Sequence, residues 1–188
     1  MAGYTALFDA CVLYPQTLRD VLLSMARTEL FRARWSATIN DEWTRNRLHK
    51  RPEQAAKIRR TLDLVNQSVP DCLVTGYESL IGSIVLPDPG DRHVVAAAIV
   101  GRADVIVTMN LKHFPATALA PFGIEAQHPD EFVYHQFGLD GVLVLTAFRV
   151  MRARFDRPPM SADEFIRHLG AKGLVKTAAA LDPFRDDL

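Results

Sequence analysis

Acidic and amide side chains stand where apolar segments of this chain begin or end. Asp9 and Asn110 each follow a short apolar run typical of a buried strand, and Asp88 and Asp91 precede an apolar stretch typical of a helix. In a parallel α/β sheet, side chains at the carboxyl ends of the strands converge at one edge although they are distant in sequence. Converging carboxylates need a cation, because neighbouring negative charges raise each other's pKa. The sequence therefore predicts a metal-dependent enzyme.

The candidate metal ligands are all hard oxygen donors, and they are Asp9, Glu42, Asp88, Asp91 and Asn110. Magnesium and manganese ions prefer oxygen ligands of this kind. One or two such ions commonly activate a water, orient a phosphodiester and stabilise both the attacking and the leaving oxygen. We therefore expect chemistry that needs no nucleophilic side chain.

Each of these residues also has a simpler structural interpretation. An aspartate at a helix start is a common N-cap, which could account for Asp91 and Asp88. Glu42 in a first helical turn would complement the helix dipole, and Asn110 suits a turn. Asp9 is harder to explain in this way, because a charge after a central apolar strand is costly unless it is paired or bound to a metal. The joint pattern is therefore more specific than its members.

The composition limits the size of the protein and its choice of partners. The chain has 188 residues, of which 48% are hydrophobic and 23% are charged, enough for one sizeable core, with or without an appendage. Its 22 Lys and Arg residues balance its 22 Asp and Glu residues, so no global positive field attracts a polyanion. Any binding to nucleic acid must therefore come from local basic patches.

Cysteine usage and hydropathy predict a cytoplasmic protein. Cys11 and Cys72 do not form the pattern of a disulfide scaffold, which fits a reducing compartment. The N-terminal apolar run is interrupted by Asp9, which a signal peptide would not tolerate in its apolar region. The longest later apolar run, residues 142–148, is far below the roughly 20 residues needed to cross a bilayer. We therefore expect no contact with a membrane.

Periodicity and turn residues predict alternating strands and helices over the first two thirds of the chain. Strands are expected over residues 4–8, 35–39, 104–108 and, at a sheet edge, 124–127. Helices are expected from residue 15, from Asn40 or Asp41, over residues 52–65 and 91–100, and from residue 129. Residues 69–86 are ambiguous, with short strands over 72–75 and 81–86 as one interpretation. Such alternation is typical of a right-handed, doubly wound parallel sheet.

The C-terminal part of the chain has a different character. No convincing strand follows residue 137, whereas residues 140–155 have an amphipathic helical pattern. Ser161 and Glu164 have the spacing of a capping box, and an alanine-rich helix is expected over residues 174–181. Because isolated helices of this length are marginally stable, we expect a small helical appendage that packs against the core.

Basic residues cluster directly after Glu42. The candidate RNA contacts are Arg45, Arg47, Lys50 and Arg51, and Lys57, Arg59 and Arg60 follow on the next expected helix. Basic side chains beside an acidic site suit contacts with phosphate, although a solvated helix face is the simpler alternative. Trp35 and Trp43 could stack on bases, but their spacing favours packing in the core.

With these motifs, the chain resembles the PIN-domain ribonucleases, most closely the VapC-like toxins of bacterial toxin–antitoxin pairs. The resemblance lies in residues 8–15, in Glu42 within Ile-Asn-Asp-Glu-Trp, and in residues 88–98 and 103–114. It covers residues 1–135 as a nuclease domain, and it leaves residues 136–188 as a helical extension similar to one found in longer PIN toxins.

This resemblance implies a PIN-like, Rossmann-like parallel sheet flanked by helices, and an endoribonuclease that requires Mg²⁺ or Mn²⁺. By analogy, Asp9, Glu42 and Asp91 match the metal-binding acids of the family, and Asn110 in Thr-x-Asn-x-x-x-Phe matches its fourth catalytic position. Asp88 matches an additional acid of one branch. The family also implies an RNA substrate, a small antitoxin that inserts into the active-site groove, and a homodimer.

Two alternatives stay open. Many PIN nucleases have Asp where this chain has Asn110, and His113 stands where some relatives carry an acid. An amide contributes no charge, so a weak or inactive scaffold that binds RNA or a partner protein is the first alternative. The second is a haloacid-dehalogenase-type phosphatase, but that chemistry needs an Asp at the position of Cys11.

Overall fold

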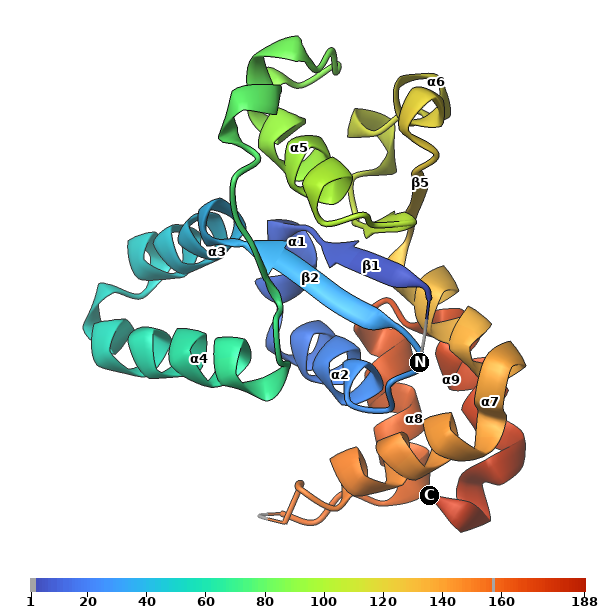
Figure 1. Cartoon of the computed structure of the whole chain (residues 1–188). Coiled ribbons are helices and arrows are strands. Elements are labelled where there is room, and N and C mark those ends of the chain that lie inside the picture. Colours follow the sequence, from blue (N-terminus) through green and yellow to red (C-terminus); the bar gives the residue numbers. More distant parts are fainter. Residues whose placement is uncertain (1–2, 157) are drawn as a thin grey trace.

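The computed structural model describes residues 3–156 and 158–188, and its centre is a five-stranded sheet (Figure 1). The strands are β1 (Thr5–Phe8), β2 (Arg32–Ser36), β3 (Leu73–Val74), β4 (Val105–Val107) and β5 (Glu125–Gln127). Their order is β3-β2-β1-β4-β5, and every pair is parallel. This confirms the predicted α/β class. It also places β1 at the centre and β5 at an edge.

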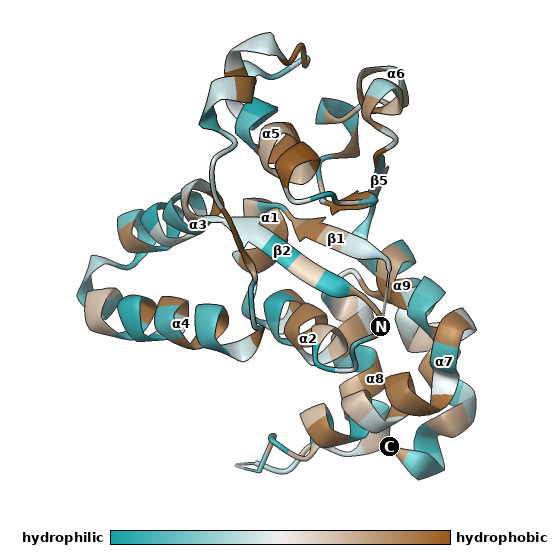
Figure 2. Cartoon of the chain, viewed as in Figure 1, coloured by the Kyte–Doolittle hydropathy of each residue, from teal (hydrophilic) through white to brown (hydrophobic). Residues whose placement is uncertain are grey.

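Helices cover both faces of the sheet (Figure 1). The first two thirds of the chain contain α1 (Ala10–Leu13), α2 (Gln16–Ala26), α3 (Ala37–Lys50), α4 (Ala55–Ser68), α5 (Arg92–Val100) and α6 (Ala116–Leu119). Helix α5 lies on one face, whereas α2 and the C-terminal helices lie on the other. Helices α3 and α4 extend beyond the sheet as a pair, and their ribbons are largely hydrophilic in Figure 2.

The core forms around the central strand. All four residues of β1 are buried, and the Phe8 ring stacks on Trp35 with 6.1 Å between the ring centroids. Phe132 from the C-terminal part completes this cluster, with its ring centroid 4.8 Å from that of Phe31. Burying one such side chain stabilises the fold by about 1.5–3 kcal/mol. Trp35 and Trp43 are fully buried, so both tryptophans pack in the core as the sequence favoured.

The expected bounds of the second strand and the following helix are wrong by several residues. The strand ends at Ser36 and α3 begins at Ala37, not at Asn40 or Asp41. The reason is a cap, because the Ser36 hydroxyl accepts a hydrogen bond from the Ile39 N–H at 3.2 Å. Helix α3 therefore gains almost one turn at its start.

The expected strand over residues 81–86 is also wrong. A 3-10 helix, η2 (Glu78–Ser83), takes up its first half, and no strand follows within the described residues of this segment. Ile84 and Leu86 are buried while Val85 is 80% exposed. This alternation mimics a strand, but the segment has no partner strand. The helix α5 after it ends before Gly101 as predicted, where an added Cβ would lie 2.9 Å from both the Ala97 carbonyl and a Val74 methyl group.

The C-terminal part is helical, as predicted. It contains α7 (Pro129–Arg152), α8 (Ala162–Ala171), α9 (Val175–Leu181) and the 3-10 helix η6 (Asp182–Asp187). Non-helical dihedral angles at Asp140 break α7, and the predicted capping box at Ser161 and Glu164 is present. The proposed domain division between residues 135 and 136 lies inside α7 and stays a prediction.

Buried polar contacts fasten these helices to the rest of the molecule. The Asp130 carboxylate at the start of α7 accepts hydrogen bonds from the backbone N–H groups of Lys176, at 2.8 Å, and Thr177, at 2.9 Å. On the other side, the Thr17 hydroxyl of α2 lies 3.1 Å from Nε2 of His168 in α8. The C-terminal helices are therefore packed on the core, as expected.

Candidate active site

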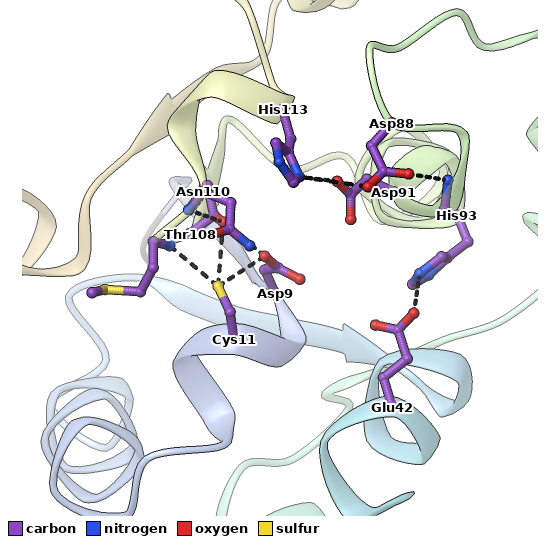
Figure 3. A network of polar contacts seen from close by, with 11 residues as sticks. Asp9, Cys11, Glu42, Asp88, Asp91, His93, Thr108, Asn110 and His113 are labelled. Carbon is purple, nitrogen blue, oxygen red and sulfur yellow. Dashed lines mark hydrogen bonds and ion pairs between the residues drawn. The ribbon is translucent and has the colours of Figure 1, made fainter. Parts of the chain in front are cut away.

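An open groove of about 490 Å³ lies where the chain leaves β1, β2 and β4 (Figure 3). It is lined by Asp9, Ala10, Cys11, Tyr14, Glu42, Arg45, Asn46, His49, Lys50, Asp91 and Asn110. All four predicted catalytic residues are in this set. Asp88, the fifth predicted metal ligand, does not line the groove but lies beside Asp91.

Asp9 is buried, with 4% of its surface exposed, and stands directly after β1. Its Oδ2 atom accepts hydrogen bonds from the Thr108 hydroxyl at 2.7 Å and from the Cys11 thiol at 3.0 Å. No donor from the described residues reaches the second oxygen, Oδ1. Although Asp9 precedes α1, its side chain makes no capping hydrogen bond. The carboxylate is thus fixed by neutral donors and keeps one oxygen free.

Cys11 and Thr108 are site residues that the sequence analysis did not assign. Burial, and then the charge of Asp9, raises the pKa of the Cys11 thiol to about 12, so the thiol remains a hydrogen-bond donor at neutral pH. Thr108 follows β4, and its hydroxyl also accepts the backbone N–H of Asn110 at 3.0 Å. The Thr-x-Asn spacing was the signal that could have identified Thr108, because it places the hydroxyl between the two predicted ligands.

Glu42 is positioned by a histidine on the facing helix. Its Oε1 atom lies 3.0 Å from Nε2 of His93, and only 7% of His93 is exposed. Among the described residues, no partner reaches the other ring nitrogen, Nδ1. Because α3 begins at Ala37, Glu42 lies beyond its first turn, and the helix-dipole explanation for this residue fails. A buried histidine within the apolar helix was the sequence signal for this contact.

Asp91 belongs to a compact group with Asp88 and His113. Nδ1 of His113 lies 2.7 Å from Oδ2 of Asp91 and 3.9 Å from Oδ2 of Asp88. One ligand atom from each of the three residues lies within 4.8 Å of the others. Burial is the main cause that raises the pKa of Asp91; the charges of Asp9 and Asp88 add to it, and the hydrogen bond from His113 opposes it.

Asp88 and Asp91 differ in whether their side chains cap a helix. The Asp88 carboxylate accepts the Gly90 N–H at 2.8 Å and thereby caps the short 3-10 helix η3 (Pro89–Asp91). The Asp91 side chain makes no capping hydrogen bond to α5, although it occupies the N-cap position. One oxygen of Asp88 therefore has a structural role, whereas Asp91 lines the groove and its side chain contacts His113 instead of a backbone group.

The predicted RNA contacts divide into two pairs. Arg45 and Lys50 line the groove. Arg47 does not, since it lies with its guanidinium 5.8 Å from the centroid of the Tyr14 ring and faces a second groove between α2 and α4. Arg51 is turned toward Glu53, with 4.0 Å between the charged atoms. The acidic end of the groove thus has two basic side chains at its rim.

The donor set fits a divalent cation. Asp9, Glu42, Asp91 and Asn110 line one groove, and their side chains carry the carboxylate and amide oxygens that hard cations prefer. Burial is the main cause that raises the pKa of Asp91, and the charges of Asp9 and Asp88 add to it. A bound divalent ion would offset the repulsion between these carboxylates. These four residues are therefore the ones that would hold Mg²⁺ or Mn²⁺.

The fold and this groove define a PIN-type α/β domain, and the family comparison agrees. The family model described as PIN domain matches residues 5–112, so the chain belongs to the PIN-domain family. A second model, described as VapC50 C-terminal domain, matches residues 129–183. The membership removes the phosphatase alternative, and the second match shows that the C-terminal helices also have relatives.

A curated relative supports the same assignment. The chain is 40% identical over 107 residues to a Mycobacterium tuberculosis (strain ATCC 25618 / H37Rv) protein named "Putative ribonuclease VapC50". The match covers 55% of this chain and 63% of the relative. No solved structure matches the chain. In residues 3–156 and 158–188, no helix is both long and apolar enough to cross a membrane.

Proposed function

We propose that this protein is a metal-dependent endoribonuclease that hydrolyses RNA phosphodiester bonds and acts as the toxin of a toxin–antitoxin pair. The observation that carries the proposal is the convergence of Asp9, Glu42, Asp91 and Asn110 in one groove. The name of the curated relative and the PIN-domain match support ribonuclease activity.

Each residue has a distinct task in this proposal. Asp9, Glu42 and Asp91 would hold Mg²⁺ or Mn²⁺, which when bound would supply activation of a water for attack on phosphorus. The amide oxygen of Asn110 completes the ligand set without adding charge. Asp88 assists from outside the groove, through the group it forms with Asp91 and His113.

The remaining groove residues bind and orient the substrate. Arg45 and Lys50 at the rim would contact the phosphates that flank the scissile bond. Thr108 and Cys11 hold one oxygen of Asp9 in place, and His93 does the same for Glu42. Positions fixed before the substrate binds lower the cost of reaching the transition state.

The second candidate function is a scaffold that binds RNA or a partner protein without cutting. Asn110 favours it, because the amide removes one negative charge from the cation site. The convergence of Asp9, Glu42 and Asp91 in one groove speaks against it, since a pure binding surface gains nothing from carboxylates that repel phosphate.

The biological setting is part of the proposal. A toxin of this family implies a cognate antitoxin that occupies the active-site groove, and a homodimer. We place the reaction in the cytoplasm, because the reduced Cys11 thiol is a donor in the site and a reducing compartment preserves it.

The decisive experiment is cleavage of total cellular RNA with Mn²⁺ or Mg²⁺, with EDTA as a control. Asp9→Asn and Asp91→Asn should abolish discrete cleavage, whereas Asp63→Asn, which changes an exposed aspartate on α4, should leave it intact. Binding of Mn²⁺ is measured in parallel by its effect on thermal unfolding. Intact RNA in a preparation that binds Mn²⁺ would refute the nuclease and favour the scaffold.

A further inference from the structure

A second groove, of about 460 Å³, lies between α2, α3 and α4. Its charged lining residues are Arg19, Arg27, Arg47, Lys57 and Arg154, with Asp20 as the one acid among the lining residues. We call it the basic groove. Four of these cations come from the nuclease domain, and Arg154 comes from the segment that follows α7. The net positive charge of this groove contrasts with the neutral balance of the whole chain.

Asp20 offsets only part of the positive charge of the basic groove. Among the described residues, none of its five cations forms an ion pair within 4.0 Å. Arg19 is only 4% exposed, and its guanidinium donates to the Leu13 carbonyl at 2.7 Å rather than to an acid. Arg27, Lys57 and Arg154 are exposed and free to contact a ligand. An anionic ligand would find several unpaired cations here.

The basic groove lies next to the candidate active site, with Tyr14 between them. Tyr14 lines the active-site groove, and the guanidinium of Arg47, which lines the basic groove, lies 5.8 Å from the centroid of the Tyr14 ring. The ammonium group of Lys50 lies 5.3 Å from the same centroid, on a residue that lines the active-site groove. Helix α3 thus carries cations that line both grooves, Arg47 in the basic groove and Arg45 and Lys50 in the active-site groove.

The chemistry of the basic groove suits a nucleic-acid strand. Leu23 and Leu64 lie among the cations, and Leu64 is 56% exposed. Phosphates can contact the basic side chains while bases lie against the apolar ones. An acidic protein segment would also find complementary charge. The cations of α3 beside Tyr14, which line both grooves, favour the substrate, because a cleaved strand must extend beyond the scissile bond.

We propose that the basic groove binds the phosphate backbone of single-stranded RNA on one side of the scissile bond, and that the C-terminal segment contributes Arg154 to this surface. The proposal rests on the ribonuclease function proposed above. Through Arg154, the C-terminal helices on the face of the sheet opposite α5 take part in substrate binding without reaching the catalytic residues.

The test compares two double variants that each remove two exposed positive charges. Arg27→Gln with Arg154→Gln changes the basic groove, and Arg59→Gln with Arg60→Gln changes α4 residues that do not line it. Binding of a labelled oligoribonucleotide of about 16 nucleotides is measured by fluorescence anisotropy in EDTA, where no cleavage occurs, over a series of salt concentrations. For single strands, each lost phosphate contact should reduce the salt slope by about 0.7.

We expect the Arg27 and Arg154 variant to bind more weakly, with a salt slope reduced by about 1.4, and the α4 variant to keep the wild-type slope. In cleavage assays, kcat/KM should fall for the long strand but not for a substrate of about four nucleotides. Equal slopes for all three proteins would overturn the proposal and leave an acidic protein segment as the occupant. If the wild-type protein cuts no RNA, the ribonuclease function fails, but the binding assay still decides the role of the groove.

Discussion

Nε2 of His93 lies 3.0 Å from Oε1 of Glu42 and joins α5 to α3 across the active-site groove. Helix α5 also carries Asp91 at its start, so one short helix holds one predicted metal ligand and positions another. The histidine is buried and has no other partner among the described residues, so the contact with Glu42 is its main polar interaction.

We expect His93→Ala to weaken Mn²⁺ binding and kcat/KM by roughly 10–100-fold, the usual effect of removing a group that orients a metal ligand. Isothermal titration calorimetry and cleavage assays measure the two effects. His93→Gln can still donate a hydrogen bond to Glu42 and should recover part of the loss. If both variants are equally stable and the alanine variant binds Mn²⁺ normally, the positioning role is wrong.

A second prediction concerns Thr108, whose buried hydroxyl donates a hydrogen bond to Asp9 and accepts one from the Asn110 N–H. Thr108→Val keeps the shape but leaves the Asn110 N–H without a partner and leaves Oδ2 of Asp9 with the Cys11 thiol as its remaining donor. Unfolding in urea should show a loss of about 1–3 kcal/mol, with weaker Mn²⁺ binding. The matched control is Thr61→Val on α4, whose exposed hydroxyl contacts only the Lys57 carbonyl, and its stability should hardly change. Equal losses in the two variants would contradict the assigned role.

The sequence identified the ligands better than the contacts that position them. Asp9 and Asn110 could be predicted because parallel strands bring their carboxyl ends to one edge, and β1 and β4 are indeed neighbours in the sheet. The partners His93 and Thr108 were missed because a hydrogen bond between distant segments leaves no periodic signal. The start of α3 was placed too late because the Ser36 cap was overlooked.

The sequence also could not show that the predicted RNA contacts line different grooves. Charge along a helix is visible in the sequence, but the direction of each side chain depends on its neighbours. Arg47 and Lys50 both lie near the ring of Tyr14, yet they line different grooves. Arg154 could not be connected with α2 at all, because its place depends on how α7 packs.

Asn110→Asp tests how far the neutral amide limits the site. The change adds a carboxylate beside Asp9, so cation binding should strengthen by roughly tenfold or more, since a carboxylate about 4 Å from a divalent ion contributes about 2 kcal/mol even at the dielectric constant of water. Without metal, the extra repulsion should lower the melting temperature in EDTA. Calorimetry and thermal unfolding measure these opposite shifts. A variant with unchanged Mn²⁺ affinity would show that Asn110 lies outside the ligand set.

Asp20, the acid of the basic groove, makes stability depend on pH. Burial is the main cause that raises its pKa above the ordinary value of 3.8, and it outweighs the attraction of Arg19, the Gln16 hydrogen bond and the more distant Arg154 and Arg47. The folded state therefore holds this proton more tightly than the unfolded state. The resulting stabilisation is fully present below pH 3.8 and is lost as the pH rises through the elevated pKa of the folded protein.

Asp20→Asn removes this titration and keeps a polar side chain of the same size. We expect the variant to be more stable than the wild-type protein at neutral pH, with a difference that shrinks as the pH falls toward the ordinary pKa of aspartate. Urea unfolding at several pH values measures the difference, and Asp186→Asn, at an exposed position near the C-terminus, is the matched control. If the basic groove binds RNA, the same variant should bind the strand more tightly, because it lacks the one anion that faces the phosphates. A stability difference that grows as the pH falls would contradict the direction of the pKa shift.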